Sequence, residues 1–335
     1  MLTPSIKPEP TRDAQANNIA LPSPEAISRA VELLRAGQVI GLPTETVYGL
    51  AGDGLNPAAL ARIFEVKQRP LFDPLILHFA DMSGAFAMAE QVPVAARELA
   101  GLFWPGPLTL VLRKTAQVPD LATSGLPHVA LRVPAHPVAQ ALLRAFGDGP
   151  LAAPSANRFG RISPTDAKAV QNELGDAVPL ILDGGPCAVG LESTVLFISE
   201  HQPVLLRAGG IPIEDIERVI GPVQRATPVD DRPQAPGQLK HHYAPRKPLH
   251  LVSGMAEIPS GPDVGWLAFG PEKGAFDGVV ENLSATGDLW EAAANFFRGL
   301  RALDDDPRVA VLYAMPLPAK GLGLAMNERL ERAAG

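Results

Sequence analysis

Residues 23–54 read SPEAISRAVELLRAGQVIGLPTETVYGLAGDG and contain three predicted elements in series. Ser23 as N-cap, a proline at the first helical position, an apolar stripe at helical spacing and Gly37 beyond the end predict a helix. The apolar run 39–42 then predicts a short buried strand, and the polar residues 43–54 are predicted to form a loop at its carboxyl end. Loops in that position often carry binding sites in α/β proteins.

A second helix is predicted directly after this loop. Asn56 is its candidate N-cap, again followed by a proline, and Leu60, Ile63, Phe64 and Lys67 fall on one stripe. Lys67 therefore ends a helix face whose other members enter the core, which is an unusual place for a cation.

Further along the chain, apolar runs typical of strands alternate with amphipathic runs typical of helices. Strands are predicted at 75–79, 108–112, 129–133, 180–182, 193–198 and 204–206, and helices at 94–103, 137–146, 164–174 and 212–220. Ser163 and Asp166 predict a start resembling a capping box for the third of these helices. Because several strands follow one another without a helix between them, the pattern predicts an α/β fold with a mixed sheet.

Proline recurs between residues 222 and 248, where the apolar periodicity stops, and this composition predicts a semi-rigid linker between two domains. We expect a flexible tail over 1–20, a large domain over 21–221, the linker over 222–248 and a small α/β domain over 249–335. In the small domain, strands are predicted at 249–252, 264–269 and 309–313 and helices at 289–303 and 322–333.

Composition sets limits on function. Hydrophobic residues make up 46% of the 335, enough for a packed core in each domain, so disorder is excluded as the main state. The formal net charge of −7 disfavours broad binding to nucleic acid. Cys187 is the one cysteine, which excludes an intrachain disulfide and a cysteine-rich metal site. No apolar run reaches the roughly 20 residues that span a bilayer, and no signal peptide is evident, so we expect a soluble cytoplasmic protein without a membrane partner.

The usual nucleotide and metal signatures are missing from the sequence. No phosphate-binding loop of the Walker type occurs, and the two Gly-x-Gly starts at Gly52 and Gly321 lack the third glycine. The seven histidines show no zinc-ligand spacing, so no metal site built from protein ligands is predicted.

The candidate functional residues lie where strands end or helices begin. Thr46 either binds a small polar ligand or caps a turn. Lys67 and Arg69 end the second predicted helix, where they either offset the helix dipole or hold phosphate oxygens. His78 lies in an apolar run, as a core residue or as a ligand contact. Arg132 lies inside an apolar strand and requires a carboxylate, a phosphate or a row of carbonyls as partner.

Four more polar residues occupy similar places. Ser155 and Asn157 follow a strand, where they either form a turn of the Asx type or contact hydroxyl and phosphate groups. Ser193 starts one predicted strand and Arg207 ends the next, followed by glycines that let backbone approach a ligand or simply form a tight turn.

Eight short segments, in this order, carry a resemblance to a known family. They are LPTETVYGL (42–50), KxRP with PLIxH (67–78), WPGPLT (104–109), VAxRVP (129–134), APSAN (153–157), ESTV (192–195), LRxG (206–209) and PGxxxxHYxP (236–245). Over about residues 20 to 250 the chain resembles the YrdC-like threonylcarbamoyl-adenylate synthase family, in the longer form with an extra carboxyl-terminal domain. The resemblance implies a twisted mixed sheet with flanking helices and a small Rossmann-like α/β second domain.

The resemblance also implies an activity. A nucleotidyltransferase would make L-threonylcarbamoyl-AMP and pyrophosphate from ATP, L-threonine and bicarbonate, with Mg²⁺ accompanying the ATP. The product would serve threonylcarbamoylation of the tRNA adenosine beside the anticodon, carried out by a separate downstream transferase, so no stable tRNA binding is expected. The sequence carries no signal for an oligomeric state.

Roles for single residues follow from the same resemblance. The catalytic cations would be Lys67 and Arg69; the threonine contacts would be Thr46, His78, Arg132 and Ser193; the ATP contacts would be Lys67, Arg69, Asp73, His128, Ser155, Asn157, Ser163, Arg207 and Tyr243. Tyr243 would belong to a lid formed by the linker. Asp73 stands where the family usually has Asn, and its charge near ATP needs a cation, a metal or a proton as compensation. His128 stands where Thr is common and still provides a hydrogen-bond donor.

Two other functions compete with this one. A double-stranded RNA or tRNA-binding module without adenylating activity would need a basic surface, which the net charge opposes. A carbamoyl transferase of the hydrogenase-maturation type would need a zinc-finger region, for which one cysteine leaves no room. In the second domain no catalytic cluster is visible, so packing, lid control and partner docking all stay open as its role.

Overall fold

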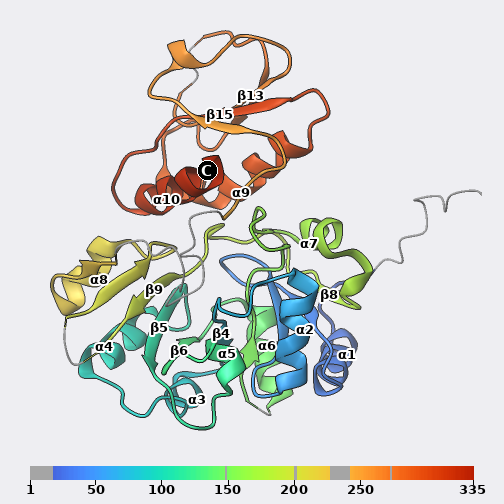
Figure 1. The fold of residues 1–335 in the computed structure, drawn as a ribbon, viewed down its shortest axis with the longest axis vertical. Coiled ribbons are helices and arrows are strands. Elements are labelled where there is room, and N and C mark those ends of the chain that lie inside the picture. Colours follow the sequence, from blue (N-terminus) through green and yellow to red (C-terminus); the bar gives the residue numbers. More distant parts are fainter. Residues whose placement is uncertain (1–17, 148, 200–201, 227–241, 272–273) are drawn as a thin grey trace, which may run out of the picture.

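The structure is a computed structural model, which describes residues 18–147, 149–199, 202–226, 242–271 and 274–335. Two sheets organise it (Figure 1). The first sheet has 11 strands in the order β1-β8-β2-β3-β7-β4-β6-β5-β9-β10-β11, and the second has four in the order β12-β15-β13-β14. We call the parts built on these sheets the first and the second domain.

The elements have the following bounds. The strands of the first domain are β1 (Ile19–Ala20), β2 (Ile40–Leu42), β3 (Gly49–Asp53), β4 (Ile76–His78), β5 (Leu108–Arg113), β6 (His128–Arg132), β7 (Leu151–Ala152), β8 (Ile181–Leu182), β9 (Thr194–Phe197), β10 (Val204–Arg207) and β11 (Gln224–Arg225). Its helices are α1 (Pro24–Arg35), α2 (Pro57–Lys67), α3 (Met82–Phe86), α4 (Val94–Phe103), α5 (Asp120–Thr123), α6 (Pro137–Phe146), α7 (Ala167–Leu174), α8 (Ile213–Ile220) and the 3₁₀ turn η1 (Gly175–Ala177).

The second domain repeats the strand-to-helix alternation on a smaller scale. It consists of β12 (Leu249–Leu251), η2 (Met255–Glu257), β13 (Val264–Ala268), β14 (Val279–Asn282), α9 (Leu289–Asp305), β15 (Val311–Ala314) and α10 (Leu322–Ala334). All pairings in its sheet are parallel. The predicted fold class, a mixed sheet with flanking helices plus a small Rossmann-like domain, is confirmed.

The helix signals of the sequence agree with the structure. The side chain of Ser23 accepts a hydrogen bond from the backbone N–H of Ala26, and that of Asn56 accepts from Ala58 and Ala59. Lys67 is buried at the end of α2, as its place on the apolar stripe predicts. Local propensity and periodicity are therefore sufficient to define α1 and α2.

Three expectations are corrected by the structure. Gly49–Asp53, predicted to lie in a loop, is strand β3, which pairs with β2 and β7. Its short glycine-containing sequence gives little strand signal, so the pairing partners decide its conformation. Ile19–Ala20, predicted to lie in the tail, pairs with β8, and Gln224–Arg225, predicted to lie in the linker, pairs with β10. Residues 1–17 of the predicted tail and 227–241 of the linker lie outside the described residues, so the bounds of the domains stay predictions.

The capping box predicted for α7 is also wrong. Asp166 is itself the N-cap, and its carboxylate accepts a hydrogen bond from the backbone N–H of Ala169 at 2.7 Å. The hydroxyl of Ser163 instead donates to Glu192 Oε1 at 2.6 Å. The ionised carboxylate of Glu192 is a stronger hydrogen-bond acceptor than a neutral group, and a short stretch of sequence around Ser163 cannot predict it.

One face of the central strands forms the floor of the candidate site. Because side chains alternate along a strand, Ile76, Val111, Ala130, Val195 and Leu206 fall on the same face and pack together. Among the described residues, the apolar side chains that pack against this cluster are Phe197, Val204 and Ala226, and none of them belongs to a helix. The larger core on the sheet instead includes buried residues of α2, α4, α7 and α8. Helices thus leave this strand face uncovered.

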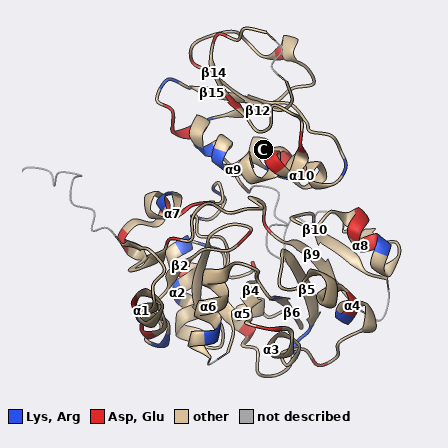
Figure 2. Ribbon diagram, turned by 180° about the vertical axis from the view of Figure 1, so that it is seen from behind, with Lys and Arg blue, Asp and Glu red and all other residues tan. Residues whose placement is uncertain are grey.

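The second domain packs on the first through its helices. Both ribbon views show α9 and α10 between the small sheet and the first domain (Figures 1 and 2). At Gly190 the backbone of the first domain closely approaches the backbone of α9, and a Cβ at this position would lie 2.3 Å from the carbonyl oxygen of Ala293. A single apolar core includes Phe296 and Phe297 of α9 together with residues of the first domain.

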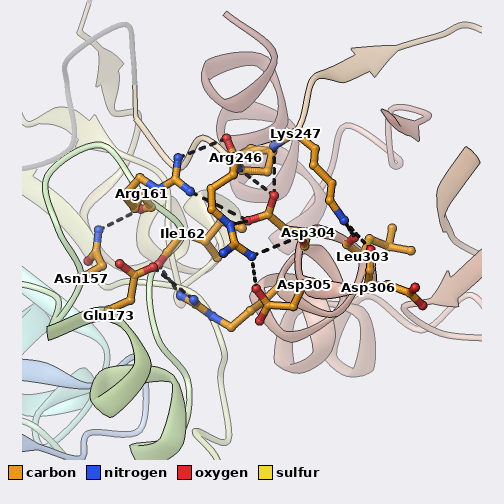
Figure 3. Close-up of polar contacts among 12 residues, drawn as sticks. Asn157, Arg161, Ile162, Glu173, Arg246, Lys247, Leu303, Asp304, Asp305 and Asp306 are labelled. Carbon is orange, nitrogen blue, oxygen red and sulfur yellow. Dashed lines mark hydrogen bonds and ion pairs between the residues drawn. The ribbon is translucent and has the colours of Figure 1, made fainter. Parts of the chain in front are cut away.

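A polar junction ties the two domains together at the end of α9 (Figure 3). Asp304 accepts hydrogen bonds from the backbone N–H of Arg246 at 2.7 Å and of Lys247 at 3.0 Å. Arg161 of the first domain lies 3.9 Å from the same carboxylate. Arg301 donates to the carbonyl of Ile162 at 2.7 Å. The loop that carries Arg161 and Ile162 is therefore held by α9.

Of the helices within the described ranges, none combines the length and apolar character of a membrane span.

Candidate active site

Strand directions bring four predicted site residues to one end of the sheet. His78 and Arg132 end the parallel strands β4 and β6 in register. Ser193 directly precedes β9, and Arg207 ends β10, which runs antiparallel to β9. β5 pairs antiparallel with β6, so the start of β5 lies beside the end of β6. β9 runs parallel to β5, so the start of β9 lies at this same end of the sheet, and all four side chains come together there.

These side chains line one small cavity of about 40 Å³. This volume is the space open to the centre of a water molecule, of which a single water needs roughly 10–15 Å³, so the cavity holds a few waters in the present conformation. Its lining consists of Thr46, Val47, Arg69, Ile76, His78, Arg132, Ala153, Pro154, Ser155, Glu192, Ser193, Arg207, His242 and Tyr243. Of the 13 residues to which the sequence assigned a role, 8 line this cavity, with 3 arginines among them.

Arg132 has the carboxylate partner that its apolar strand requires. Its Nη2 donates to Glu45 Oε1 at 2.7 Å and to Thr46 Oγ1 at 2.9 Å, and its Nε donates to the carbonyl of Gly106 at 3.3 Å. Among the described residues no contact uses Nη1. Because a guanidinium carries five N–H groups, the two on Nη1 stay available to a ligand.

The loop after β2 contains two threonines, and the two alternatives given for Thr46, a turn or a ligand contact, are found at different ones of them. Thr44 forms a turn, because its hydroxyl donates to the carbonyl of Val47 at 2.6 Å. Thr46 lines the cavity and bonds Arg132.

His78 and Ser193 are buried and also line the cavity. Burial, together with the charge of neighbouring Arg132, lowers the pKa of His78 to about 3, so the imidazole is neutral at physiological pH. Its Nδ1 lies 3.1 Å from the carbonyl oxygen of Ile76. The hydroxyl of Ser193 lies 2.7 Å from that of Thr109 and accepts from Arg207 at 3.1 Å. Both side chains are fixed, as binding groups need to be.

Arg69 supplies the cation that Asp73 requires. The two side chains form an ion pair of 2.8 Å, and Arg69 also donates to the carbonyls of Asp73 and Pro74. Burial raises the pKa of Asp73, whereas Arg69 opposes this shift. Asp73 does not line the cavity, but Arg69 does. A contact between Asp73 and ATP stays a prediction, and the pair positions the Arg69 guanidinium.

Lys67 lies behind the cavity wall. Its ammonium donates to the carbonyls of Ser155 at 2.5 Å and Asn157 at 2.6 Å. Burial lowers its pKa well below the usual value, and the charge of Arg69 lowers it further. The structure therefore gives Lys67 the role of holding the loop at 155–157, which neither sequence alternative included.

The loop at 155–163 is fixed on several sides. Ser155 lines the cavity. The amide of Asn157 donates to the carbonyls of Arg158 and Arg161, both at 2.8 Å, which is a turn of the kind expected from its type. Ser163 lies on the far side of the loop, bonded to Glu192. Ser155 is thus the member of this loop with direct access to the cavity.

Glu192 lines the cavity and was not assigned a role from the sequence. It accepts from Ser163 and, at 2.8 Å, from Nε of Arg329 on α10. Burial alone would raise its pKa, but Arg329, Arg207 and the Ser163 hydroxyl outweigh burial and lower the pKa to about 2. Glu45 was likewise missed. Both stand inside quoted segments, but their partners Arg132 and Arg329 are too distant in sequence to be recognised.

Tyr243 lines the cavity from the segment that precedes β12. Its φ of +70° is a left-handed conformation, which costs a non-glycine residue of order 1–3 kcal/mol and is found at functional sites. Its hydroxyl is buried and has no hydrogen-bond partner among the described residues. An unpartnered hydroxyl of this kind is suited to a bound ligand.

His128 lies outside the cavity, on the same strand face. In β6, alternation places it with Ala130 and Arg132, roughly 13 Å from Arg132 at about 3.3 Å per residue. Its ring stacks edge-on against Phe197, with ring centroids 4.8 Å apart, and both residues line a second hollow with Val111 and Pro127. The uncovered face thus extends from Arg132 to His128.

No group of three or more His, Cys, Asp or Glu residues that could hold a metal ion occurs within the described part of the chain. Cys187 is buried, and burial raises the pKa of its thiol. A reactive thiol therefore has no support in the surroundings of Cys187.

Comparisons with known proteins give a consistent result. A family model described as "Telomere recombination", named for the Sua5, YciO and YrdC proteins, matches residues 32–209. A second model, described as "Threonylcarbamoyl-AMP synthase, C-terminal domain", matches residues 211–335. The chain is 41% identical over 318 residues to a protein of Pyrococcus abyssi named threonylcarbamoyl-AMP synthase, with 91% of this chain and 93% of that protein covered.

A bacterial relative and a solved structure agree. The protein of Bacillus subtilis with the same name is 40% identical over 323 residues, covering 92% of this chain and 93% of that protein. The crystal structure of P. abyssi Sua5 complexed with L-threonine matches with a TM-score of 0.86 and 39% identity, covering 95% of this chain and 96% of that one. The similarity therefore extends over both domains.

Proposed function

Because this chain belongs to the threonylcarbamoyl-AMP synthase family, we propose that it makes L-threonylcarbamoyl-AMP and pyrophosphate from L-threonine, bicarbonate and ATP. The observation that carries the proposal is that one cavity brings Arg132, His78 and Ser193 together with Arg69 and Arg207. A carboxylate and phosphate groups can thus be held side by side.

The threonine subsite is built around Arg132. The free N–H groups of Nη1 bind the carboxylate of threonine, and Glu45 and Thr46 fix the guanidinium plane through Nη2. Thr46, His78 and Ser193 contact the amino, hydroxyl or carboxylate groups of the substrate. Since His78 is neutral, it adds no charge that would compete with Arg132 for the carboxylate.

The nucleotide subsite uses the rest of the cavity and the uncovered strand face. Arg69 and Arg207 neutralise the triphosphate, while Ser155 contacts it from the loop that Lys67 holds. The apolar floor of Val111, Ala130 and Phe197 extends to His128 and provides a flat surface for the adenine ring. Four of the ATP contacts that the family resemblance implies act by positioning neighbouring groups rather than by touching the nucleotide. They are Lys67, Asp73, Asn157 and Ser163.

The reaction needs positioning and charge neutralisation more than a nucleophilic side chain. The amine of threonine takes up the carbon of bicarbonate to form a carbamate, with release of water. A carbamate oxygen then forms a bond to the α-phosphorus, and the bond from that phosphorus to the bridging oxygen breaks as pyrophosphate leaves. Arg69 and Arg207 stabilise the charge on the phosphate oxygens in this step.

Tyr243 closes the site from the second domain's side. Its buried ring and the neighbouring His242 line the cavity and exclude water. Exclusion of water matters because the carbamate and the mixed anhydride are both lost by reaction with water. We assign the lid role that the sequence predicts for the linker to its described residues His242 and Tyr243 on this basis.

Mg²⁺ belongs to the substrate in this proposal and enters as MgATP. The described residues contain no acidic cluster to hold it, so phosphate oxygens and water provide its ligands. It spreads the charge of the triphosphate together with Arg69 and Arg207.

A downstream tRNA threonylcarbamoyl transferase in the cytoplasm consumes the product. Stable tRNA binding by this chain itself is not part of the proposal. Figure 2 shows the described Lys and Arg residues as short separate segments in this view, and the formal net charge of −7 opposes a long phosphate track. Family membership and this distribution both disfavour the RNA-binding alternative.

Pyrophosphate release tests the proposed function. We expect release from ATP when L-threonine and bicarbonate are both present, and a fall to background when either is omitted. Omission of bicarbonate requires degassed buffer because dissolved carbon dioxide is a substrate source. Release that is independent of threonine would contradict the proposal, and tight, salt-sensitive RNA binding without any release would favour the alternative.

A further inference from the structure

Arg329 is a buried cation on α10 of the second domain whose side chain reaches the first domain. It is 1% exposed. Its Nε donates to Glu192 Oε2 at 2.8 Å, and its Nη1 donates to the carbonyls of Ala208 at 3.0 Å and Ala325 at 2.9 Å. Ala325 belongs to its own helix, whereas Glu192 and Ala208 belong to the first domain. The guanidinium therefore bridges the two domains.

The carboxylate that Arg329 holds is part of the cavity wall. Glu192 stands next to Ser193, and its other oxygen accepts from Ser163. The carbonyl of Ser193 accepts from Arg207 at 3.0 Å, and the carbonyl of Glu192 accepts from the backbone N–H of Gly210 at 3.0 Å. A shift of Glu192 would thus move groups of both proposed subsites.

The same guanidinium supports the lid residue. It lies over the ring of Tyr243, 5.3 Å from the centroid, and that ring also packs against the rings of Phe297 at 5.6 Å and His242 at 4.1 Å. A cation over an aromatic ring attracts it, and more strongly where both are desolvated. Tyr243 and Glu192, on two sides of the cavity, therefore share one cation.

We propose that Arg329 is a positioning residue for the reaction, through which the second domain fixes Glu192 and Tyr243 at the active site. This inference rests on the proposed function and adds a role for the second domain. Arg329 does not line the cavity, so its effect on substrate passes through these two side chains.

The proposal has a pH signature. The charged or titratable groups around the Glu192 carboxylate are Arg329 from α10, Arg207 from β10, Lys67 from α2, and His242 and Tyr243 from the segment before β12. In the intact protein the carboxylate is ionised, because its pKa of about 2 lies below the ordinary 4.5, and the charged form is lost only as the pH falls toward 2. Without Arg329, burial raises the pKa with less opposition. Protonation of Glu192 then begins at a higher pH.

The variants R329M and R329K, made in the full chain, test this. Pyrophosphate release is measured with ATP, threonine and bicarbonate across the pH range in which each variant stays folded. We expect R329M to lower kcat/KM roughly 10- to 100-fold, by analogy with the loss of residues that orient metal ligands. We also expect an acid limb in its pH profile at higher pH than in the wild type. R298M, which removes an exposed arginine of α9, is the matched control and should behave as wild type.

A second substitution separates positioning from a general loss of packing. Glu192→Gln in the R329M chain removes the titrating carboxylate, so the added acid limb should disappear although Arg329 is still absent. Persistence of that limb in the double variant would overturn the proposal.

The remaining outcomes are also decisive. If R329M does not fold, R329K takes its place: lysine keeps the charge but cannot span Glu192 and Ala208, so we expect a smaller loss and a smaller shift of the acid limb. Wild-type turnover and an unshifted profile in a folded R329M or R329K would refute the role of Arg329 and leave the proposed function intact. Absence of threonine-dependent release in the wild type would instead refute the proposed function.

Discussion

Replacement of Arg69 by methionine is expected to lower kcat by about 10²- to 10³-fold, the cost of removing one electrostatic donor from the charge that develops in the transition state. Arg69 lines the cavity, and its guanidinium is held in place by Asp73 and by the carbonyl of Pro74, so methionine removes a positioned charge. Steady-state pyrophosphate release, at saturating ATP and threonine, measures the effect.

Stability has to be separated from catalysis in this variant. Loss of Arg69 leaves Asp73 buried without its ion-pair partner, which costs about 3–5 kcal/mol of folding free energy. The double variant R69M/D73N removes both charges, so its thermal midpoint should recover toward wild type while kcat stays low. D73N alone keeps the guanidinium in the cavity and should retain most of the turnover. Recovery of turnover along with stability in R69M/D73N would exclude Arg69 from the chemistry.

Replacement of Arg132 by methionine is expected to weaken threonine binding by about 10²-fold, because hydrogen bonds to charged groups contribute about 1.5–3 kcal/mol each. Titration calorimetry with L-threonine measures the change directly. ATP affinity, which depends on Arg69, Arg207 and the apolar floor, should change by less than about threefold. The split between the two ligands distinguishes a local subsite from general damage.

Glu45→Gln provides the control for Arg132. It keeps the guanidinium but neutralises its partner, and R132M/E45Q removes the pair together, so that neither carboxylate nor cation is left buried alone. We expect threonine affinity to be lost in both chains that lack Arg132 and largely kept in E45Q. A folded R132M with wild-type threonine affinity would remove Arg132 from the subsite.

The sequence predicts much of this site because short-range patterns determine the helices and strands on which its residues lie. Period-two alternation places His128, Ala130 and Arg132 on one strand face, and caps and apolar stripes define α1 and α2. The apolar setting of Arg132 by itself predicts a carboxylate, a phosphate or a row of carbonyls as partner, and the structure supplies Glu45. Fold class and most cavity residues therefore follow from local signals and from segments shared with a known family.

Contacts between residues that are far apart in the chain could not be predicted from the sequence. β3 has weak strand propensity and is a strand because β2 and β7 pair with it. The sequence predicts that Lys67 offsets the helix dipole or holds phosphate oxygens, but it gives no sign that the ammonium also donates to carbonyls about ninety positions later, at Ser155 and Asn157. Arg329 lies in a domain without any catalytic pattern, and only the packing of α10 brings it to Glu192. Such contacts are set by tertiary packing, which has no signature within a short window of sequence.

The most direct test of the central claim, that one cavity joins threonine to the nucleotide through captured carbon dioxide, is mass spectrometry of the product made with isotope-labelled bicarbonate. With carbon-13 bicarbonate, L-threonine and ATP, the account predicts threonylcarbamoyl-AMP that is heavier by the label, while AMP formed by its hydrolysis stays unlabelled. An unlabelled adenylate of threonine, or product that forms without bicarbonate, would contradict the account.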